Sequence, residues 1–453
     1  MLINNPIPDN VFSSNAMNKI ILNALVSVDP NQCVRNALNL KGDTLIIKDQ
    51  VVDLQKIGRV FIIGVGKAVL PMALAISDTL GDLITEGALI AKHTDTVIQS
   101  KLNSRIKVLI GSHPIPSEDS VNATNVMLET LKRTAPEDLV IGLISGGGSA
   151  LMTNPVKKIG LAGLQRTTSL LLKCGATIEE MNTIRKHLDL VKGGGLLKYI
   201  YPAKSFHLIL SDVLGDPLSM IASGPTAADP TTFQDCLEII HKFKFDDQVD
   251  KEVLKYLQKG AEGSIEETIK EGSEIITHNK NFIVGSLSIA AQAACAQAEA
   301  SGFETELLTT SLRGEAKTVG AELASQLVDV VQNKKNRGKP LCMIAGGETT
   351  VTVSGNGKGG RNQELSLAAA QVLEGVDNCV LISFATDGED GPTDAAGGFV
   401  TGKTIKAGLN LGLDSQKYLN DNNAYEFLEK TDALIQTGPT GTNVNDLVLM
   451  FAF

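Results

Sequence analysis

Short runs of consecutive apolar residues alternate with amphipathic segments along the whole chain. The first run, RVFII at 59–63, passes directly into a glycine turn and an apolar segment with helical spacing at 68–80. Similar runs lie at 87–92, 107–111, 138–145, 205–211, 281–286, 304–310, 341–345, 379–388 and 447–451. Apolar runs of this length predict buried strands, and their alternation with helices predicts an α/β fold with mainly parallel sheets. Such sheets bind ligands at the carboxyl ends of their strands.

A chain of 453 residues is too long for a single ordinary core. The segment 236–278 is charged, has helical spacing and carries no loop that suggests a site. We therefore predict an N-terminal α/β domain over residues 1–270 and a C-terminal one over residues 271–453. The strand at 281–286 is expected to begin the second α/β run. At the start of the chain, a pair of helices is expected from 15 to 40.

The stretch 341–370 combines several features of a phosphate site. Its strand breaks at a glycine pair before Glu348, a short β segment is expected at 350–353, and the glycine-rich loop 354–360 leads to Arg361 and Asn362 at the start of a helix. Glycines let backbone N–H groups approach an anion, a helix start adds partial positive charge, and Arg361 adds a fork of donors. The alternative is a polar hairpin loop before a surface helix.

Two further glycine loops follow predicted strands. Gly66 and Lys67 end the first, and the second runs through Ser145, Gly146, Gly147, Gly148 and Ser149. Lys67 is suited to neutralise a phosphoryl group or a carboxylate, and the second loop offers successive N–H donors to phosphate oxygens. Both loops also have a purely structural interpretation. A dinucleotide fingerprint is incomplete, because Val69 replaces its third glycine and the next strand ends in Lys92 rather than in an acid.

Acidic residues occupy similar strand ends. Asp212, Asp387 and Asp390 each follow an apolar run. Such carboxylates accept the proton of an attacking hydroxyl or hold Mg²⁺ in phosphoryl transfer, although an aspartate also caps turns. His113, between Ser112 and Pro114, is expected to brace a loop, with a catalytic role as the alternative. His187, beside a neighbouring arginine and lysine, lies either in a site or on a solvated helix face.

Composition narrows the class of protein. A net charge of −10 gives no basic surface for nucleic acid or anionic membrane. The six cysteines show no metal-ligand spacing, and neither an export signal nor an apolar run of membrane length is present. We expect a cytoplasmic enzyme with a small-molecule substrate, without nucleic-acid or membrane partners, as a monomer or homodimer.

Eight motifs in order together resemble the glycerate 2-kinases of the MOFRL type (class II glycerate kinases). They are GVGKA (64–68), GSHPIP (111–116), LISGGGSALM (143–152), IRKHLDLVKGGGL (184–196), LILSDVLGDPLSMIASGPT (208–226), GGETTVTVSGNGKGGRNQE (346–364), ATDGEDGPTDAAG (385–397) and GPTGTNVNDL (438–447). The resemblance implies two three-layer α/β/α domains, a Rossmann-like one and a MOFRL-type one, with the active site in the cleft between them. It also implies Mg²⁺-dependent transfer of a phosphoryl group from ATP to the 2-hydroxyl of D-glycerate.

The resemblance places the family's important lysine on Lys67 and its important arginine on Arg361. With Asp212 as base or metal-side carboxylate, these form the predicted catalytic set, and Asp387 and Asp212 the predicted metal ligands. Substrate- and ATP-binding positions are expected at Gly66, Ser145, Gly146, Gly147, Gly148, Ser149, Glu348, Gly360, Asn362, Asn443 and Asn445. Arg361 is expected to grip the glycerate carboxylate and Lys67 the phosphoryl group, with the exchanged roles as an alternative. Two other functions stay open: an NAD(P)H-dependent hydroxypyruvate reductase and a non-catalytic sensor of sugar acids.

Overall fold

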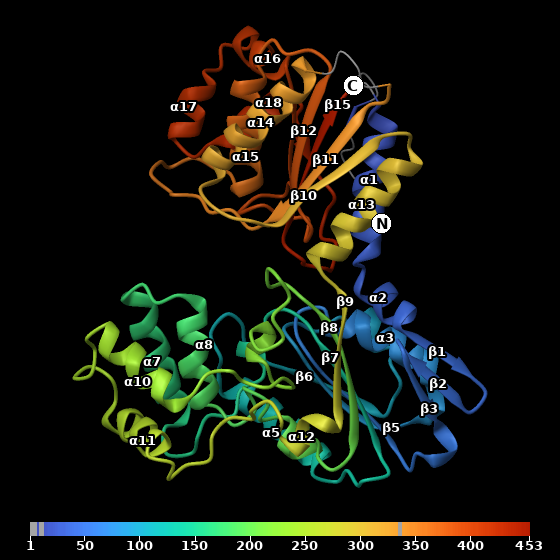
Figure 1. The fold of residues 1–453 in the computed structure, drawn as a ribbon, viewed down its shortest axis with the longest axis vertical. Helices are drawn as coiled ribbons and strands as arrows, with labels where there is room; N and C mark the ends of the chain where they lie inside the picture. Colours follow the sequence, from blue (N-terminus) through green and yellow to red (C-terminus); the bar gives the residue numbers. More distant parts are fainter. Residues whose placement is uncertain (1–6, 9–12, 334–337) are drawn as a thin grey trace. The chain divides into compact units, whose positions relative to one another are not determined.

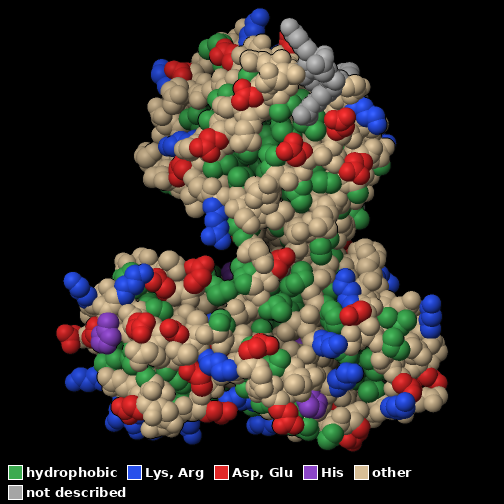
Figure 2. Space-filling view, viewed as in Figure 1, with side chains coloured by type: hydrophobic (Ala, Val, Ile, Leu, Met, Phe, Trp, Pro, Cys, Tyr) green, Lys and Arg blue, Asp and Glu red, His purple; other side chains and the backbone are tan. Residues whose placement is uncertain are grey.

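A computed structural model describes residues 7–8, 13–333 and 338–453 of the chain. The chain forms two compact units (Figure 1): Pro30–Val284 is one, and Met1–Asp29 with Gly285–Phe453 is the other. No described helix has the length and apolar character needed to cross a membrane. On the face that Figure 2 shows, acidic and basic side chains are interspersed over each unit.

The unit Pro30–Val284 is built on a six-stranded sheet of order β6-β5-β4-β7-β8-β9. Its strands are β4 (Val60–Val65), β5 (Ile84–Ala91), β6 (Ile106–Ile110), β7 (Leu139–Ile144), β8 (Lys204–Leu210) and β9 (Asn279–Gly285). Every pairing from β6 to β8 is parallel, so the loops that follow these strands emerge at one edge. The assignment of 281–286 to the second α/β run was wrong, because β9 adds to the edge of this first sheet beside β8.

Helices cover both faces of this sheet. Ile63 and Phe61 of β4 turn one face toward Met127 and Leu128 of α5 (Glu118–Leu131). The opposite face meets α3 (Val69–Leu80), where Gly64 leaves room for the first side chain of the helix. The α5 helix begins with a capping box at Ser117. The three layers predicted for this unit are therefore present.

A separate bundle of helices in the same unit has its own core. It is formed by α7 (Gly160–Lys173), α8 (Ile178–His187), α10 (Phe233–Lys242) and α11 (Lys251–Ala261). Buried apolar residues join these helices, among them Leu171, Ile184, Phe233, Ile240 and Leu257. Shorter helices of the unit are α2 (Pro30–Ala37), α4 (Thr96–Gln99), α6 (Gly148–Leu151), α9 (Leu197–Ile200) and α12 (Glu274–Thr277).

A small antiparallel sheet follows α2. Its strands are β1 (Leu38–Lys41), β2 (Thr44–Ile47) and β3 (Gln50–Asp53), in that order. The two helices expected over 15–40 are present as α1 (Ser14–Ser27) and α2, but the second ends early, at Ala37. Strands of four residues show too few alternations to be distinguished from a helix end by periodicity.

The other unit has a six-stranded mixed sheet of order β10-β11-β15-β12-β13-β14. The strands are β10 (Glu304–Leu312), β11 (Leu341–Gly347), β12 (Cys379–Ala385), β13 (Gly397–Thr401), β14 (Leu434–Ile435) and β15 (Asp446–Ala452). Only β10 and β11 pair in parallel among these described strands. The short strand expected at 350–353 is absent, since Thr350 makes only an isolated bridge to Glu315.

Helices lie on both faces of the mixed sheet (Figure 1). One face packs on α14 (Ala316–Gln332), α15 (Arg361–Leu373), α16 (Thr404–Asn410), α17 (Ser415–Asn420) and α18 (Ala424–Lys430). The other face meets α13 (Leu287–Ala300), on which α1 (Ser14–Ser27) packs. The hydroxyl of Thr442 donates to the carbonyl of Val28 at 2.8 Å. This bond ties the residue after α1 to the loop before β15 in the same unit. The predicted fold class, two α/β domains with helices on both sheet faces, is confirmed. The expectation of mainly parallel strands holds for the first sheet but not for the second, whose described pairings are antiparallel except that of β10 with β11.

Candidate active site

The loops after β4 and β7 interlock at the carboxyl edge of the first sheet. The backbone N–H of Lys67 donates to the carbonyl of Gly146 at 2.9 Å, and that of Ala68 donates to Ser145 Oγ at 3.1 Å. Gly66 has φ +132°, and a Cβ there would lie 2.1 Å from Ser145 Oγ. Only glycine fits this crossing. The two sequence-predicted loops therefore form one structure, which leaves the Lys67 side chain exposed.

Asp212 and His113 border the same loop. A Cβ on Gly146 would lie 2.2 Å from Asp212 Oδ2, so the carboxylate sits directly against the loop backbone. Gly147 has φ +81°, and a Cβ there would lie 3.0 Å from His113 Cδ2 and 3.3 Å from Lys67 Cε. The structure thus brings together Lys67, the glycine loop and Asp212, as predicted from the sequence. Lys67 has no ion-pair partner among the residues that the structure describes.

His113 is neutral at physiological pH. Burial, as the main cause, and the positive charges of Lys67 and Lys92 together lower the pKa of His113 to about 4. A neutral imidazole beside Lys67 adds no positive charge to the loop. The positive charge that this edge offers to an anion therefore comes from lysine and not from His113.

A buried network supports the glycine loop from behind. Ser149 Oγ lies 2.6 Å from Ser223 Oγ, and the Ser223 hydroxyl donates to Asn182 Oδ1 at 3.0 Å. The Lys192 ammonium donates to the carbonyl of Ser149 at 2.8 Å and lies 3.2 Å from Asp189. Sequence reasoning missed these supports, because the partners are far apart in the chain and each alone resembles an ordinary polar residue.

The helix α8 does not present a solvated basic face, which had been one interpretation of its sequence. Lys186 is buried and its Nζ lies 2.5 Å from Asp229 Oδ1. His187 is also buried, with Nδ1 2.8 Å from the carbonyl of Thr183 and Nε2 2.9 Å from Glu267 Oε1. The pKa of Glu267 is about 2, because contacts with His187 and with backbone N–H groups outweigh the opposing effect of burial. These residues hold α8 in place.

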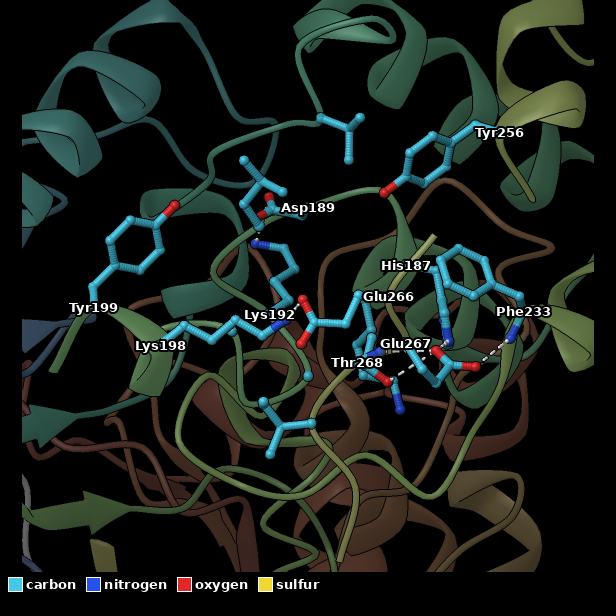
Figure 3. A pocket seen from close by; sticks show the side chains of 16 residues that line it. His187, Asp189, Lys192, Lys198, Tyr199, Phe233, Tyr256, Glu266, Glu267 and Thr268 are labelled. Atoms are coloured by element: carbon cyan, nitrogen blue, oxygen red, sulfur yellow. Dashed lines mark hydrogen bonds and ion pairs between the residues drawn. The ribbon is translucent and has the colours of Figure 1, made fainter. Parts of the chain in front are cut away.

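A pocket of about 170 Å³ lies beside this part of α8 (Figure 3). Its charged groups are paired with one another: Lys198 lies 2.9 Å from Glu266, and Lys192 contacts Asp189. Neither Lys67 nor Asp212 lines it. The pocket therefore belongs to the scaffold behind the glycine loop.

In the other unit, Arg361 stands at the start of α15 and is held by two carboxylates. Its Nε lies 2.5 Å from Asp446 Oδ2 and its Nη2 lies 3.0 Å from Asp446 Oδ1. Its Nη1 lies 3.2 Å from Glu348 Oε1. Burial alone would lower the pKa of Arg361, but the bonds and charge of Asp446 raise it. Glu348 was predicted from the sequence, whereas the role of Asp446 was not.

Asp390 caps the N-terminus of α15. Its two carboxylate oxygens accept the backbone N–H groups of Asn362 at 3.1 Å and Gln363 at 2.8 Å. Burial raises the pKa of Asp390 to about 7, against the opposing effect of these hydrogen bonds. Asn362 is itself buried, and its side chain bonds Asp390 and Ser383. Asp390, which the sequence grouped with Asp387 as a strand-end acid, therefore caps a helix, whereas Asp387 is half-buried.

The glycine-rich loop before Arg361 uses several of its amides internally. Asn422 Oδ1 accepts the N–H groups of Ser354 and Gly355, both at 2.8 Å. The N–H of Lys358 donates to Asn423 Oδ1 at 3.0 Å. These amides are occupied, which contradicts the expectation that the whole loop cradles a phosphate. Gly360, at its end, packs so closely on Asp390 that a Cβ would lie 2.3 Å from the carboxyl carbon.

Asp387, Asn443 and Asn445 meet where β12 ends and β15 begins. Asp387 is half-buried, and its Oδ1 accepts the N–H of Glu389 at 3.1 Å. Asn443 Oδ1 accepts the N–H of Asn445, whose φ of 71° is left-handed. The Asn445 carbonyl accepts the hydroxyl of Thr386 at 2.7 Å. Asn445 thus shapes a turn. Among the described residues, no group of three or more His, Cys, Asp or Glu is placed to hold a metal ion.

Known proteins share this arrangement over almost the entire chain. Residues 16–258 match a family described as a domain of unknown function, DUF4147, and residues 341–446 match the MOFRL family. A Pyrococcus horikoshii protein named glycerate 2-kinase is 41% identical over 432 residues, which is 95% of each chain. The chain belongs to the MOFRL-type glycerate kinase family.

Other members of the family agree in sequence and in structure. A Thermotoga maritima protein named D-glycerate 2-kinase is 42% identical over 86% of this chain and 90% of its own. A crystal structure of a glycerate kinase from Thermotoga maritima superposes with a TM-score of 0.86 at 37% identity, covering 97% of this chain and 99% of that one. The family's fold therefore extends over both units.

Proposed function

We propose that the protein phosphorylates D-glycerate on its 2-hydroxyl, with ATP as phosphoryl donor. The observation that carries the proposal is the edge of the first sheet, where the exposed Lys67 lies against the Gly146–Gly147 backbone with no acidic partner among the described residues. A cation placed there without a counter-ion is suited to an anionic ligand. Both relatives described above carry a glycerate 2-kinase name.

Within the unit Pro30–Val284, Lys67 neutralises charge on the transferring phosphoryl group. The ligand can approach the backbone closely at Gly146, Gly147 and Gly148. The hydrogen bonds of Ser149 with Ser223 and Lys192 hold the loop in position. Asp212, against the same backbone, accepts the proton of the attacking hydroxyl. Phosphoryl transfer asks mainly for positioned groups and for charge neutralisation, and this edge supplies both.

Within the other unit, Arg361 serves the phosphate side of the reaction. The carboxylates of Asp446 and Glu348 already accept from three of its nitrogens, so its fork is not open to a third carboxylate. A guanidinium held in this way remains a fixed positive charge for a polyphosphate. Of the two assignments left open by the sequence, these contacts favour phosphate for Arg361.

Asp212 and Asp387 fit the needs of Mg²⁺. Magnesium is commonly held by one or two carboxylates, several waters and the substrate phosphates, and does not require a cage of three protein acids. Both aspartates are half-buried residues at strand ends. Asp212 or Asp387 would hold Mg²⁺ together with the nucleotide, and the ion would supply positive charge to the phosphates.

ADP release from MgATP and D-glycerate tests the proposal. We expect Lys67→Ala and Arg361→Ala each to lower kcat/KM at least about a hundredfold, or about 2.7 kcal/mol. Lys101→Ala, at an exposed lysine outside the loops, is the matched control and should stay within about twofold. A wild-type protein that releases no ADP with glycerate would refute the function, and near-normal turnover in either variant would remove that residue from it.

A further inference from the structure

Arg185, on α8, is a half-buried arginine without a partner among the residues that the structure describes. Eight arginines lie in the described part of the chain, and six of them donate to a carboxylate or to a carbonyl. The remaining two are Arg313, which is exposed, and Arg185, which is half-buried. Arg185 has no hydrogen bond or ion pair with any described residue, and burial lowers its pKa with no acid to oppose the effect. A sheltered charge without a counter-ion is costly and requires an explanation.

The position of Arg185 links it to the glycine loop. Asn182 precedes it by one helical turn and so lies on the same face of α8. Asn182 accepts the hydroxyl of Ser223, which contacts Ser149 of the loop. The positive charge of Arg185 also contributes to lowering the pKa of Lys192, whose ammonium supports Ser149. Arg185 is not among the residues that line the pocket of Figure 3, where the charges are already paired.

The guanidinium of Arg185 is chemically suited to the carboxylate of glycerate, to which no residue has been assigned so far. The proposed function requires a cation for the carboxylate of glycerate, and Arg361 is already engaged by Asp446. A guanidinium presents parallel N–H donors at the spacing of carboxylate oxygens. We propose that Arg185 binds the carboxylate of the hydroxy-acid substrate and so selects acids over neutral polyols. This inference rests on the proposed function and assigns a specificity-determining residue to it.

Kinetics of Arg185→Gln, Arg185→Lys and the control Arg166→Gln test the assignment. Arg166 is an exposed arginine of the same unit whose partner is Asp250, outside the loops. We expect Arg185→Gln to raise KM for D-glycerate at least about thirtyfold and to leave KM for MgATP within about twofold. Arg185→Lys, which keeps the charge but loses the fork, should fall between, at about tenfold. Arg166→Gln should behave as wild type.

Thermal unfolding supplies a readout independent of turnover. D-Glycerate should raise the Tm of the wild type and of Arg166→Gln, and this ligand shift should be lost in Arg185→Gln. Without ligand, Arg185→Gln should melt no lower than wild type, because the substitution removes an uncompensated charge. A residue of merely structural role would show the reverse pattern, with a lower Tm and an intact ligand shift.

The outcomes separate this inference from the function beneath it. An active wild type whose Arg185→Gln variant keeps its KM for glycerate overturns the inference alone. A variant with a raised KM for MgATP and an unchanged one for glycerate also overturns it, and assigns Arg185 to the nucleotide phosphates. A wild type that neither phosphorylates glycerate nor is stabilised by it overturns the proposed function, and the inference falls with it.

Discussion

The guanidinium of Arg361 and the carboxylate of Asp446 form a two-point ion pair across 85 residues of sequence. Nε lies 2.5 Å from Oδ2 and Nη2 lies 3.0 Å from Oδ1. The pair joins the first residue of α15 to the first residue of β15, and Asp446 is buried. Two parallel bonds fix the plane of the guanidinium as well as its position. Asp446 is therefore a positioning residue for Arg361.

Asp446→Asn should disturb both stability and activity. The substitution leaves Arg361 without its buried counter-charge, and we expect a loss of about 1–3 kcal/mol in the free energy of unfolding in urea. With Arg361 less firmly oriented, kcat/KM should fall about tenfold to a hundredfold. Glu348→Gln is the control for stability, because the Glu348 side chain is 48% exposed and its single contact should contribute less than about 1 kcal/mol. Equal stability losses in the two variants would contradict the role given to Asp446.

Asp390 should make stability depend on pH. Its pKa is about 7 in the folded protein and close to 3.9 in an unfolded chain. Between these values the folded state keeps a proton that the unfolded state has released, so stability falls as pH rises, by up to about 1.4 kcal/mol per pH unit. The contribution is full below about pH 4 and is lost above about pH 7.

Urea unfolding of wild type and Asp390→Asn from pH 5 to pH 8 measures this effect. The asparagine does not titrate, so the stability of wild type relative to the variant should decline from pH 5 to about pH 7 and level off above it. A difference that stays constant with pH would show that Asp390 is already ionised at pH 5 in the folded protein, contrary to its burial under α15.

The positive charge of Lys67 should have a measurable effect on the pKa of His113. In wild type the pKa of His113 is about 4, with burial as the main cause and Lys67 as the next. Lys67→Met removes a neighbouring positive charge, so the imidazolium becomes easier to form and the pKa should rise toward, without reaching, the ordinary value of about 6.5. NMR titration of the His113 ring protons follows this directly, and Lys101→Met should leave the pKa unchanged. No shift in Lys67→Met would mean that the two side chains are farther apart than the structure places them.

Asn422 should control the order of the glycine-rich loop. Its side-chain oxygen accepts from Ser354 and Gly355, and its amide donates to Glu364 at 3.0 Å. Asn422→Ala removes these bonds, so amide exchange over 354–358 should accelerate at least about tenfold, while exchange in β11 stays slow. Asn420→Ala, two residues earlier and exposed, is the matched control. Unchanged exchange in Asn422→Ala would show that another contact fixes the loop.

The sequence was most informative where one local pattern determines the structure. Apolar runs located the strands of both six-stranded sheets except β13 and β14, which no predicted run covers. The strand-to-loop positions of Lys67, Gly146 and Asp212 were sufficient to group these residues, because parallel strands share a carboxyl edge. The motif order identified the family before any coordinates were considered. These features depend on residues close together in the chain.

Features that depend on distant partners were not predicted. Nothing local to Arg361 or Asp446 indicates that their side chains meet. The sequence likewise gives no sign that backbone amides of 354–358 are hydrogen-bonded, because their partner Asn422 lies far along the chain. Burial of Lys186 depends on Asp229, 43 residues later, so periodicity alone could not distinguish it from a solvated residue. The packing of α1 on α13 is likewise a contact between segments far apart in the sequence.

The position of the new phosphate on glycerate tests the central claim most directly. Purified protein is given MgATP and D-glycerate, and the product is offered to enolase with and without phosphoglycerate mutase. The proposed 2-kinase makes a product that enolase alone converts to phosphoenolpyruvate. Conversion that requires the mutase would place the phosphate on the 3-hydroxyl, and absence of ADP together with oxidation of NADPH by hydroxypyruvate would replace the kinase with a reductase.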